Sequence, residues 1–270
     1  MKKKVFALVL ACAACLSLLA ACGSKKNETV TLKVGATPAP HADILEQVKP
    51  ILAEQNINLE IVEFTDYVTP NTSTEDGSID ANYFQHITYM NNFNAENGTH
   101  LVSVAGIHYE PFALYAGKTA SLADLAEGAQ VGVPNNATNE ARALLLLEQE
   151  GLITLKEGVG INATKLDIVE NPLNLDIVEL EAAQLTTRRA DLDLAVINGN
   201  YAIDAGLDLA DALAVEAADG AAAEAYVNVI AVKEGNEKNE AIQALVKALQ
   251  SDAIRDYINE TYKGAVVPLF

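Results

Sequence analysis

The stretch Asp80-Ala-Asn-Tyr-Phe-Gln-His-Ile-Thr-Tyr-Met90 concentrates aromatic side chains in a chain that is only 6% aromatic and contains no Trp. The rings of Tyr83, Phe84, His86 and Tyr89 fall within seven residues. Apolar aromatic side chains are most often core residues, so one interpretation is a strand that enters the core. The other interpretation is a ligand-binding wall of aromatic faces with one imidazole, and the rest of the chain has to distinguish the two.

The first 21 residues have the pattern of a secretory signal peptide. Three lysines precede an apolar run that is too short for a membrane-spanning helix. The run ends in Leu19-Ala-Ala-Cys22, which resembles the bacterial lipobox, in which the cysteine becomes the lipidated first residue. We therefore expect removal of residues 1–21, a lipid on Cys22, and a polar tether over residues 22–29 at the extracytoplasmic face of the cell membrane. The alternative is an ordinary signal peptide with an incidental cysteine.

Cysteine content and charge exclude several functions. Two of the three cysteines, Cys12 and Cys15, leave with the signal peptide, so the processed chain has neither a disulfide nor a cysteine nucleophile or metal ligand. The signal peptide carries three lysines and no acidic residue, so its removal lowers the formal net charge from −19 to −22. Such a chain repels phosphate backbones and anionic lipids, and we expect no nucleic-acid partner.

Strand and helix patterns alternate along the processed chain and predict an α/β fold with a largely parallel sheet. Residues 66–78 have a turn-rich composition. The expected strands cover residues 29–36, 58–64, 101–107, 111–116, 130–133, 166–169, 175–180, 193–197 and 227–232. The expected helices cover residues 41–56, 88–97, 139–150, 181–188 and 200–205, a short one opens at Ser121, and one long helix covers residues 239–262.

Two strands, one in each half of the chain, have the same sequence pattern. Residues 79–84 precede Gln85 and His86, and residues 192–197 precede Asn198; an Asp enters each strand and polar side chains follow it. In open parallel sheets, ligands bind outside the carboxyl ends of the strands. The pattern therefore indicates two lobes that face a shared cleft.

Three residues outside the opening stretch are candidates for binding a charged ligand. Arg142 is expected at the start of the helix over residues 139–150, where the helix dipole disfavours a cation but a carboxylate ligand would bind. A solvated arginine paired with Glu140 or Glu148 is the alternative. Asn198 and Asn228 follow or lie within strands, where an amide can accept from an ammonium or donate to a carboxylate. Each asparagine taken singly is equally consistent with a turn or a backbone contact.

No catalytic or metal-binding pattern is recognisable. The histidines are scattered, without the spacing of metal ligands. A nucleophile elbow, a zinc-protease helix and a phosphate-binding loop are all missing. We expect no enzymatic activity, no cofactor and no metal, with a secreted hydrolase kept as an alternative because catalytic triads are assembled in space.

Seven segments together resemble the NlpA/MetQ family of methionine-binding lipoproteins. They span nearly the whole processed chain in the order of the family. The segments are Val34–His41, Asp66–Asn71, Asp80–His86, Arg142–Leu147, Glu179–Leu185, Asp193–Asn200 and Gly264–Pro268. The resemblance implies a two-lobed periplasmic-binding-protein fold of type 2. Lobe one would comprise residues 30–113 and 229–270, and lobe two residues 114–228.

The resemblance also implies a function, that of the substrate-binding protein of an ABC importer, which delivers L-methionine or a close relative to the permease. The side-chain sleeve would be formed by Tyr67, Phe84, His86 and Tyr89, while Arg142 would hold the α-carboxylate and Asn198 and Asn228 the head group. The chemistry fits methionine, because a thioether favours aromatic surroundings and a desolvated zwitterion needs oriented polar partners.

Some positions depart from the family pattern. Thr88 stands where the family usually has Pro, which affects how Tyr89 is presented. Residues 186–189 and the Ala-rich residues 217–225 also differ. Alternatives are therefore another small amino acid, a methionine-containing dipeptide, or a surface interaction lipoprotein without a role in transport.

Overall fold

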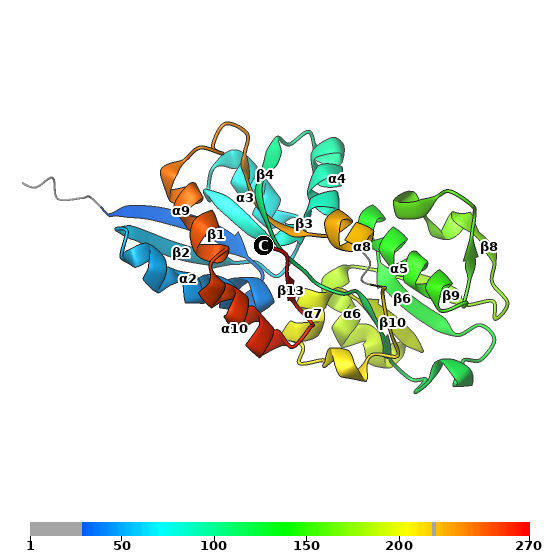
Figure 1. Cartoon of the computed structure of the whole chain (residues 1–270). Coiled ribbons are helices and arrows are strands. Elements are labelled where there is room, and N and C mark those ends of the chain that lie inside the picture. The colour runs from blue at the N-terminus through cyan, green and yellow to red at the C-terminus, as the bar shows by residue number, and fades with distance from the viewer. Residues whose placement is uncertain (1–28, 218–219) are drawn as a thin grey trace, which may run out of the picture.

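The computed structural model describes residues 29–217 and 220–270. The expected signal peptide, the Cys22 lipidation site and residues 22–28 of the expected tether lie outside the described residues. Figure 1 shows two lobes side by side, each built around its own sheet. Among the described helices, none has both the length and the apolar character needed to cross a membrane.

The sheet of lobe one has six strands in the order β13-β4-β12-β3-β1-β2. β1 pairs in parallel with β2 and β3, whereas β12 is antiparallel to both β3 and β4. The bounds are β1 (Val30–Ala36), β2 (Ile57–Glu63), β3 (Ala81–His86), β4 (Leu101–Tyr109), β12 (Asn228–Lys233) and β13 (Val267–Pro268).

The sheet of lobe two has five strands in the order β11-β5-β10-β6-β9. β6 is parallel to β10 and β9, but β5 is antiparallel to β10 and β11. Both sheets are therefore mixed. The prediction of a largely parallel sheet is wrong for β5, the first strand after the chain crosses to lobe two, and for β12, the first strand after it crosses back. The bounds are β5 (Ala113–Ala116), β6 (Gln130–Pro134), β9 (Asp176–Leu180), β10 (Leu194–Ile197) and β11 (Ala214–Val215), with a separate pair β7 (Thr154–Leu155) and β8 (Ile168–Glu170).

Strand alternation divides the apolar side chains between the two faces of each sheet. In β12, Ile230 and Val232 join the main core of lobe one, while Val229 and Ala231 pack on the other face. The helices that contribute to the main core are α2 (Asp43–Ala53), α9 (Glu240–Leu249) and α10 (Asp252–Tyr262). The other helices of this lobe are α3 (Thr69–Asp76) and α4 (Ile87–Asn97). Tyr83 belongs to the main core and Phe84 to a small aromatic cluster, as alternation predicts.

Lobe two has the same layered construction. Leu194 and Val196 of β10 pack into one core, and Ala195 and Ile197 into a second core on the opposite face. The helices of this lobe are α5 (Ala137–Gln149), α6 (Ala182–Arg188) and α7 (Gly199–Asp204), followed by α8 (Gly220–Ala225) near the return to lobe one. The short helix expected at Ser121 is the 3-10 helix η2 (Leu122–Asp124).

Two expectations about the helices are wrong. Residues 66–78 are not simply turns but contain α3, because the Asp66 carboxylate accepts from the N–H groups of Val68 and Thr69, and Pro70 is compatible with a first helical turn. Residues 239–262 form two helices, because Ser251 is extended and begins α10 anew. The apolar spacing continues across this break, which is why the pattern resembled one helix.

Two segments carry the chain between the sheets. Residues 110–112 join β4 to β5, and residues 216–227 join β11 to β12. Glu110 of the first segment and Asn228, which directly follows the second, line the candidate site.

Candidate ligand-binding site

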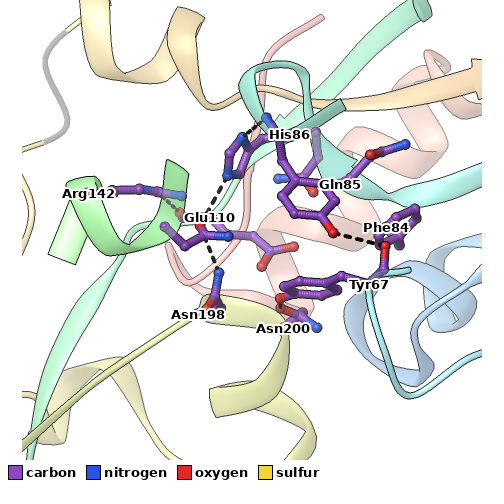
Figure 2. Close-up of a pocket in the computed structure, with 12 residues that line it drawn as sticks. Tyr67, Phe84, Gln85, His86, Glu110, Arg142, Asn198 and Asn200 are labelled. Atoms are coloured by element: carbon purple, nitrogen blue, oxygen red, sulfur yellow. Dashed lines mark hydrogen bonds between the residues drawn. The ribbon is translucent and has the colours of Figure 1, made fainter. Parts of the chain in front are cut away.

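A small cavity is lined by residues from both lobes. All seven residues that the sequence analysis selected line it: Tyr67, Phe84, His86, Tyr89, Arg142, Asn198 and Asn228. Five further lining residues were not predicted: Gln85, Glu110, Asn139, Gly199 and Asn200. Figure 2 shows eight of these twelve side chains with labels.

β3 and β10, the two strands with the shared sequence pattern, end at this cavity. β3 ends at His86, and β10 is followed directly by Asn198. His86 is also the N-cap of α4, because its Nδ1 accepts from the backbone N–H of Tyr89 at 3.0 Å. The carboxyl ends of the two strands therefore supply polar groups from opposite lobes, as expected from the sequence.

Aromatic rings form one wall of the cavity. The Tyr67 ring centroid lies 5.7 Å from that of Phe84 and 5.6 Å from that of Tyr89, and it stacks on Tyr201 at 5.0 Å. The Tyr67 hydroxyl donates to Asn200 Oδ1 at 2.5 Å, and the Tyr89 hydroxyl donates to the backbone carbonyl of Tyr67 at 3.1 Å. These bonds direct the hydroxyls to protein acceptors, which leaves apolar ring surface for a ligand.

The guanidinium of Arg142 is 5% exposed and lies among aromatic rings. Its Cζ lies 4.2 Å from the ring centroid of Tyr226 and 4.8 Å from that of Phe112. Nη2 donates to the backbone carbonyl of Glu110 at 2.7 Å, and Nε donates to Glu216 Oε2 at 2.8 Å. Nη1 makes no hydrogen bond to another described residue, so it can donate to a ligand carboxylate.

The structure corrects two expectations about Arg142. Helix α5 begins at Ala137 with Asn136 as its N-cap, so Arg142 lies in the second turn and not at the helix start. Its carboxylate partner is Glu216, which lies on the return segment to lobe one.

The two carboxylates proposed as partners in the alternative interpretation are engaged elsewhere. Glu140 accepts from the backbone N–H of Lys165 at 3.0 Å, and Glu148 accepts from that of Leu155 at 2.7 Å. Among the described residues, neither carboxylate bonds Arg142, whose partners are Glu216 and the carbonyl of Glu110.

A chain of hydrogen bonds starting from a backbone donor fixes the orientation of Asn198. The N–H of Tyr89 makes His86 Nδ1 an acceptor, so His86 Nε2 carries the proton and donates to Asn139 Oδ1 at 3.1 Å. Burial, and then the nearby Arg142 charge, lower the pKa of His86 to about 3, which keeps this imidazole neutral. Asn198 Nδ2 donates to the same Asn139 oxygen at 3.1 Å. The Asn198 Oδ1 is buried and has no hydrogen-bond partner among the described residues.

Beneath the cavity lies a buried polar layer that the sequence analysis did not predict. Glu110 Oε1 lies 2.8 Å from His108 Nε2 and 3.4 Å from His41 Nε2. The same nitrogen of His41 lies 3.1 Å from Asn228 Oδ1. His41, His108 and Glu110 offer ligand atoms within 4.8 Å of one another, a grouping with the donor types of a metal site. His41 lies in the helical turn Pro38–Ala42, far in sequence from His108 and Glu110, so no metal-ligand spacing signalled the group.

Glu110 is the most important omission of the sequence analysis. It follows β4 directly, and a charged side chain at the end of a strand was the signal that could have found it. Burial raises the pKa of Glu110. Gly199 permits the close approach of α7, because a Cβ at residue 199 would lie 2.7 Å from Glu110 Oε2. The cavity thus combines a guanidinium, a carboxylate and an unpartnered amide oxygen, which together suit a zwitterion.

Comparisons with known proteins all find similarity to one family of lipoproteins. The family model described as NlpA lipoprotein matches residues 32–270. D-methionine-binding lipoprotein MetQ of Salmonella typhimurium is 42% identical over 270 residues, covering 98% of each chain.

Solved structures give the same result. A putative lipoprotein from Ruminococcus gnavus superposes with a TM-score of 0.87 at 56% identity, covering 89% of this chain and 99% of the other. A nutrient-binding protein from Burkholderia cenocepacia, bound to methionine, superposes with a TM-score of 0.84 at 40% identity, covering 88% of this chain and all of the other.

Proposed function

The chain belongs to the NlpA lipoprotein family, and we propose that it is the substrate-binding protein of an ABC importer, capturing L-methionine between its two lobes. The observation that carries this proposal is the polar end of the cavity. Arg142, whose Nη1 has no partner among the described residues, and Asn198, whose Oδ1 is buried without one, both line this cavity. A ligand with both a carboxylate and an ammonium satisfies both groups at once, which a buried site requires.

The charged groups of the cavity assign the two ends of the ligand. Arg142 and the amide nitrogen of Asn228 bind the α-carboxylate, since both are donors. Asn198 Oδ1 and Glu110 accept from the α-ammonium. The opposite charges of Arg142 and Glu110 match the dipole of a zwitterion, and that match disfavours a ligand that lacks either group.

The aromatic wall receives the side chain of the ligand. Tyr67, Phe84 and Tyr89 present ring surface, and the neutral His86 extends it. A thioether is polarisable and gains from contact with aromatic rings. An unbranched methionine side chain therefore suits this wall better than a charged or strongly polar one.

We further propose that the protein binds without catalysis, is anchored by a lipid on Cys22 and works at the extracytoplasmic face of the cell membrane, where it delivers the ligand to the permease. The two separate sheets support a division into lobe one, proposed as residues 30–113 and 229–270, and lobe two, proposed as residues 114–228, although Ala113 already begins β5 of lobe two and Asn228 begins β12 of lobe one. The relatives named as lipoproteins support the anchor.

Titration calorimetry of the processed protein with L-methionine, D-methionine and the other amino acids tests the function. We expect L-methionine to bind and Arg142→Ala to weaken its binding by roughly 30-fold or more, since a buried charged hydrogen bond is lost. The matched control is Arg188→Ala, because Arg188 is exposed and pairs only with nearby Asp191 among the described residues. Absence of methionine binding, or binding that Arg142→Ala leaves unchanged, would refute the assignment.

One observation favours a longer ligand as a second candidate. A further cavity shares Tyr67 and Tyr89 with the first and continues between the lobes toward Glu96 and Glu181. A methionine-containing dipeptide could extend into it. Native mass spectrometry of the protein as purified distinguishes the two ligands, because a retained ligand reports its own mass.

A further inference from the structure

The buried layer beneath the cavity consists of two relays with the same construction. In the first, the Thr37 hydroxyl lies 2.7 Å from His41 Nδ1, and His41 Nε2 lies 3.1 Å from Asn228 Oδ1. In the second, the Tyr83 hydroxyl lies 2.5 Å from His108 Nδ1, and His108 Nε2 lies 2.8 Å from Glu110 Oε1. Each relay runs from a hydroxyl through a fully buried imidazole to a group that lines the cavity.

The acceptor at the end of the second relay fixes its proton positions. Because a carboxylate oxygen accepts, His108 Nε2 carries the proton and Nδ1 accepts from the Tyr83 hydroxyl. His41 Nε2 faces the same carboxylate oxygen and an amide, so it too is a donor, and Nδ1 accepts from Thr37. Burial lowers the pKa values of His41 and His108 to about 4 and about 3, so both imidazoles stay neutral.

We propose that His41 and His108 are positioning residues that set which end of the ligand each side of the cavity accepts. His41 holds the Asn228 oxygen, so that the Asn228 amide nitrogen faces the ligand carboxylate. His108 holds one oxygen of Glu110, and the carboxylate also accepts from the backbone N–H of Asn200. The remaining acceptor capacity of Glu110 serves the ligand ammonium. This inference rests on the proposed function, because it requires a ligand with both groups.

The same geometry argues against a metal ion in this layer. A metal would need the Nε2 lone pairs of both imidazoles, and each Nδ1 would then have to donate to its hydroxyl. The Tyr83 hydroxyl is fully buried and bonds His108 Nδ1. In that tautomer His108 Nδ1 carries a proton and no longer accepts from the Tyr83 hydroxyl. The buried hydroxyl would then be a donor without an acceptor, which is costly.

Substitutions in pairs separate positioning from simple packing. His41→Leu and His108→Leu remove the donor, while His41→Gln and His108→Gln keep an N–H near the position of Nε2. Each is titrated with L-methionine, with 4-(methylthio)butanoate, which lacks the ammonium, and with 3-(methylthio)propylamine, which lacks the carboxylate. Thr37→Val and Tyr83→Phe remove only the outer hydroxyls and provide the same test if a leucine variant does not fold.

The two relays predict opposite selectivity. His41→Leu should weaken L-methionine and the butanoate about tenfold, the effect of one buried hydrogen bond, and leave the amine within about twofold. His108→Leu should weaken the binding of L-methionine and of the amine and leave the affinity for the butanoate unchanged. The glutamine variants should retain affinity within about threefold, and the hydroxyl variants should follow the pattern of their own relay at smaller size.

Three results would overturn the inference. The first is an equal loss for all three compounds, which packing alone would cause. The second is unchanged binding in the leucine variants of a protein that binds L-methionine normally. The third is saturable zinc binding by the wild-type protein that His41→Gln abolishes. Failure of the unmodified protein to bind L-methionine would instead refute the proposed function, so the two failures are distinguishable.

Discussion

Asn198 and Asn228 are the same residue type, yet the structure gives their amides opposite roles. Asn139 takes the amide nitrogen of Asn198 and leaves its oxygen free, while His41 takes the oxygen of Asn228. The groups behind each asparagine therefore fix the orientation of its amide, and the proposed assignment of the ligand ends rests on that orientation. A residue-by-residue transfer from relatives identifies such positions but says nothing about the orientation of the amide.

Gly199 lets the start of α7 pack directly against Glu110. In Gly199→Ala, the new Cβ would lie 2.7 Å from both Cβ and Oε2 of Glu110, so we expect a loss of about 1–3 kcal/mol in unfolding free energy and weaker methionine binding. Gly132→Ala is the control, because its Cβ would crowd Leu192 within lobe two, away from the residues that line the cavity. Urea unfolding and calorimetry measure both quantities. Unchanged affinity in Gly199→Ala would contradict the role given to Glu110.

The residues that could be predicted from the sequence are those with local signals. Phe84, His86 and Asn198 lie at strand ends where alternation and polar residues mark a cleft, and the structure places all three on the cavity. His41 was missed because its partner Asn228 is distant in sequence, whereas Glu110 had a local signal, its place directly after β4, that was not used. Arg142 was selected for the wrong reason, since it lies in the second turn of its helix and the helix start is occupied by Asn136.

At the scale of elements, the N-cap of α5 affects both the stability of the helix and the orientation of a cavity residue. Asn136 Oδ1 accepts both the backbone N–H and the side-chain amide of Asn139. One N-cap thus begins the helix and also orients the residue that holds His86 and Asn198. The cap of α9 is different, since Asn239 bonds the N–H groups of Ala241 and Ile242 and none of these residues lines the cavity.

The two caps provide a matched test. Asn136→Ala and Asn239→Ala should each lower the unfolding free energy by about 1 kcal/mol, because each removes an N-cap acceptor. Only Asn136→Ala should also weaken methionine binding, by roughly threefold to tenfold, because Asn139 loses its own partner. Chemical unfolding and calorimetry on both variants check this. Equal affinities in the two variants would show that the α5 cap does not orient the site.

Element types were predicted more reliably than their limits. Apolar spacing identified α2, but the same kind of spacing continued through the break between α9 and α10 at Ser251. The turn-rich composition of residues 66–78 concealed α3, whose start depends on one aspartate side chain. Strand direction could not be predicted, because it depends on the two returns of the chain between the lobes.

For the whole molecule, the site is a contact between lobes as much as a cavity. The Tyr201 hydroxyl donates to the backbone carbonyl of Thr65, and the Tyr67 hydroxyl donates to Asn200, so lobe two is bonded to lobe one on the aromatic side. His86 bonds Asn139 on the polar side. These contacts enclose the cavity, so separation of the lobes would expose the ligand and its charged partners together.

Closing the lobes over neutral imidazoles makes the folded protein sensitive to acid. Burial, and then Arg142, lower the pKa of His86 to about 3, whereas an unfolded histidine has a pKa of about 6.5. The unfolded chain therefore binds a proton that the folded chain does not. The stability contribution is present above pH about 6.5 and is lost as the pH falls toward the folded value. Between pH 7 and pH 5, the titration of His86 alone should lower the free energy of unfolding by about 2 kcal/mol.

His86→Gln removes this titration while the other buried histidines and Glu110 remain. Urea unfolding should therefore show that the variant loses about 2 kcal/mol less unfolding free energy than the wild type over this interval. Equal losses would mean that His86 is not held neutral.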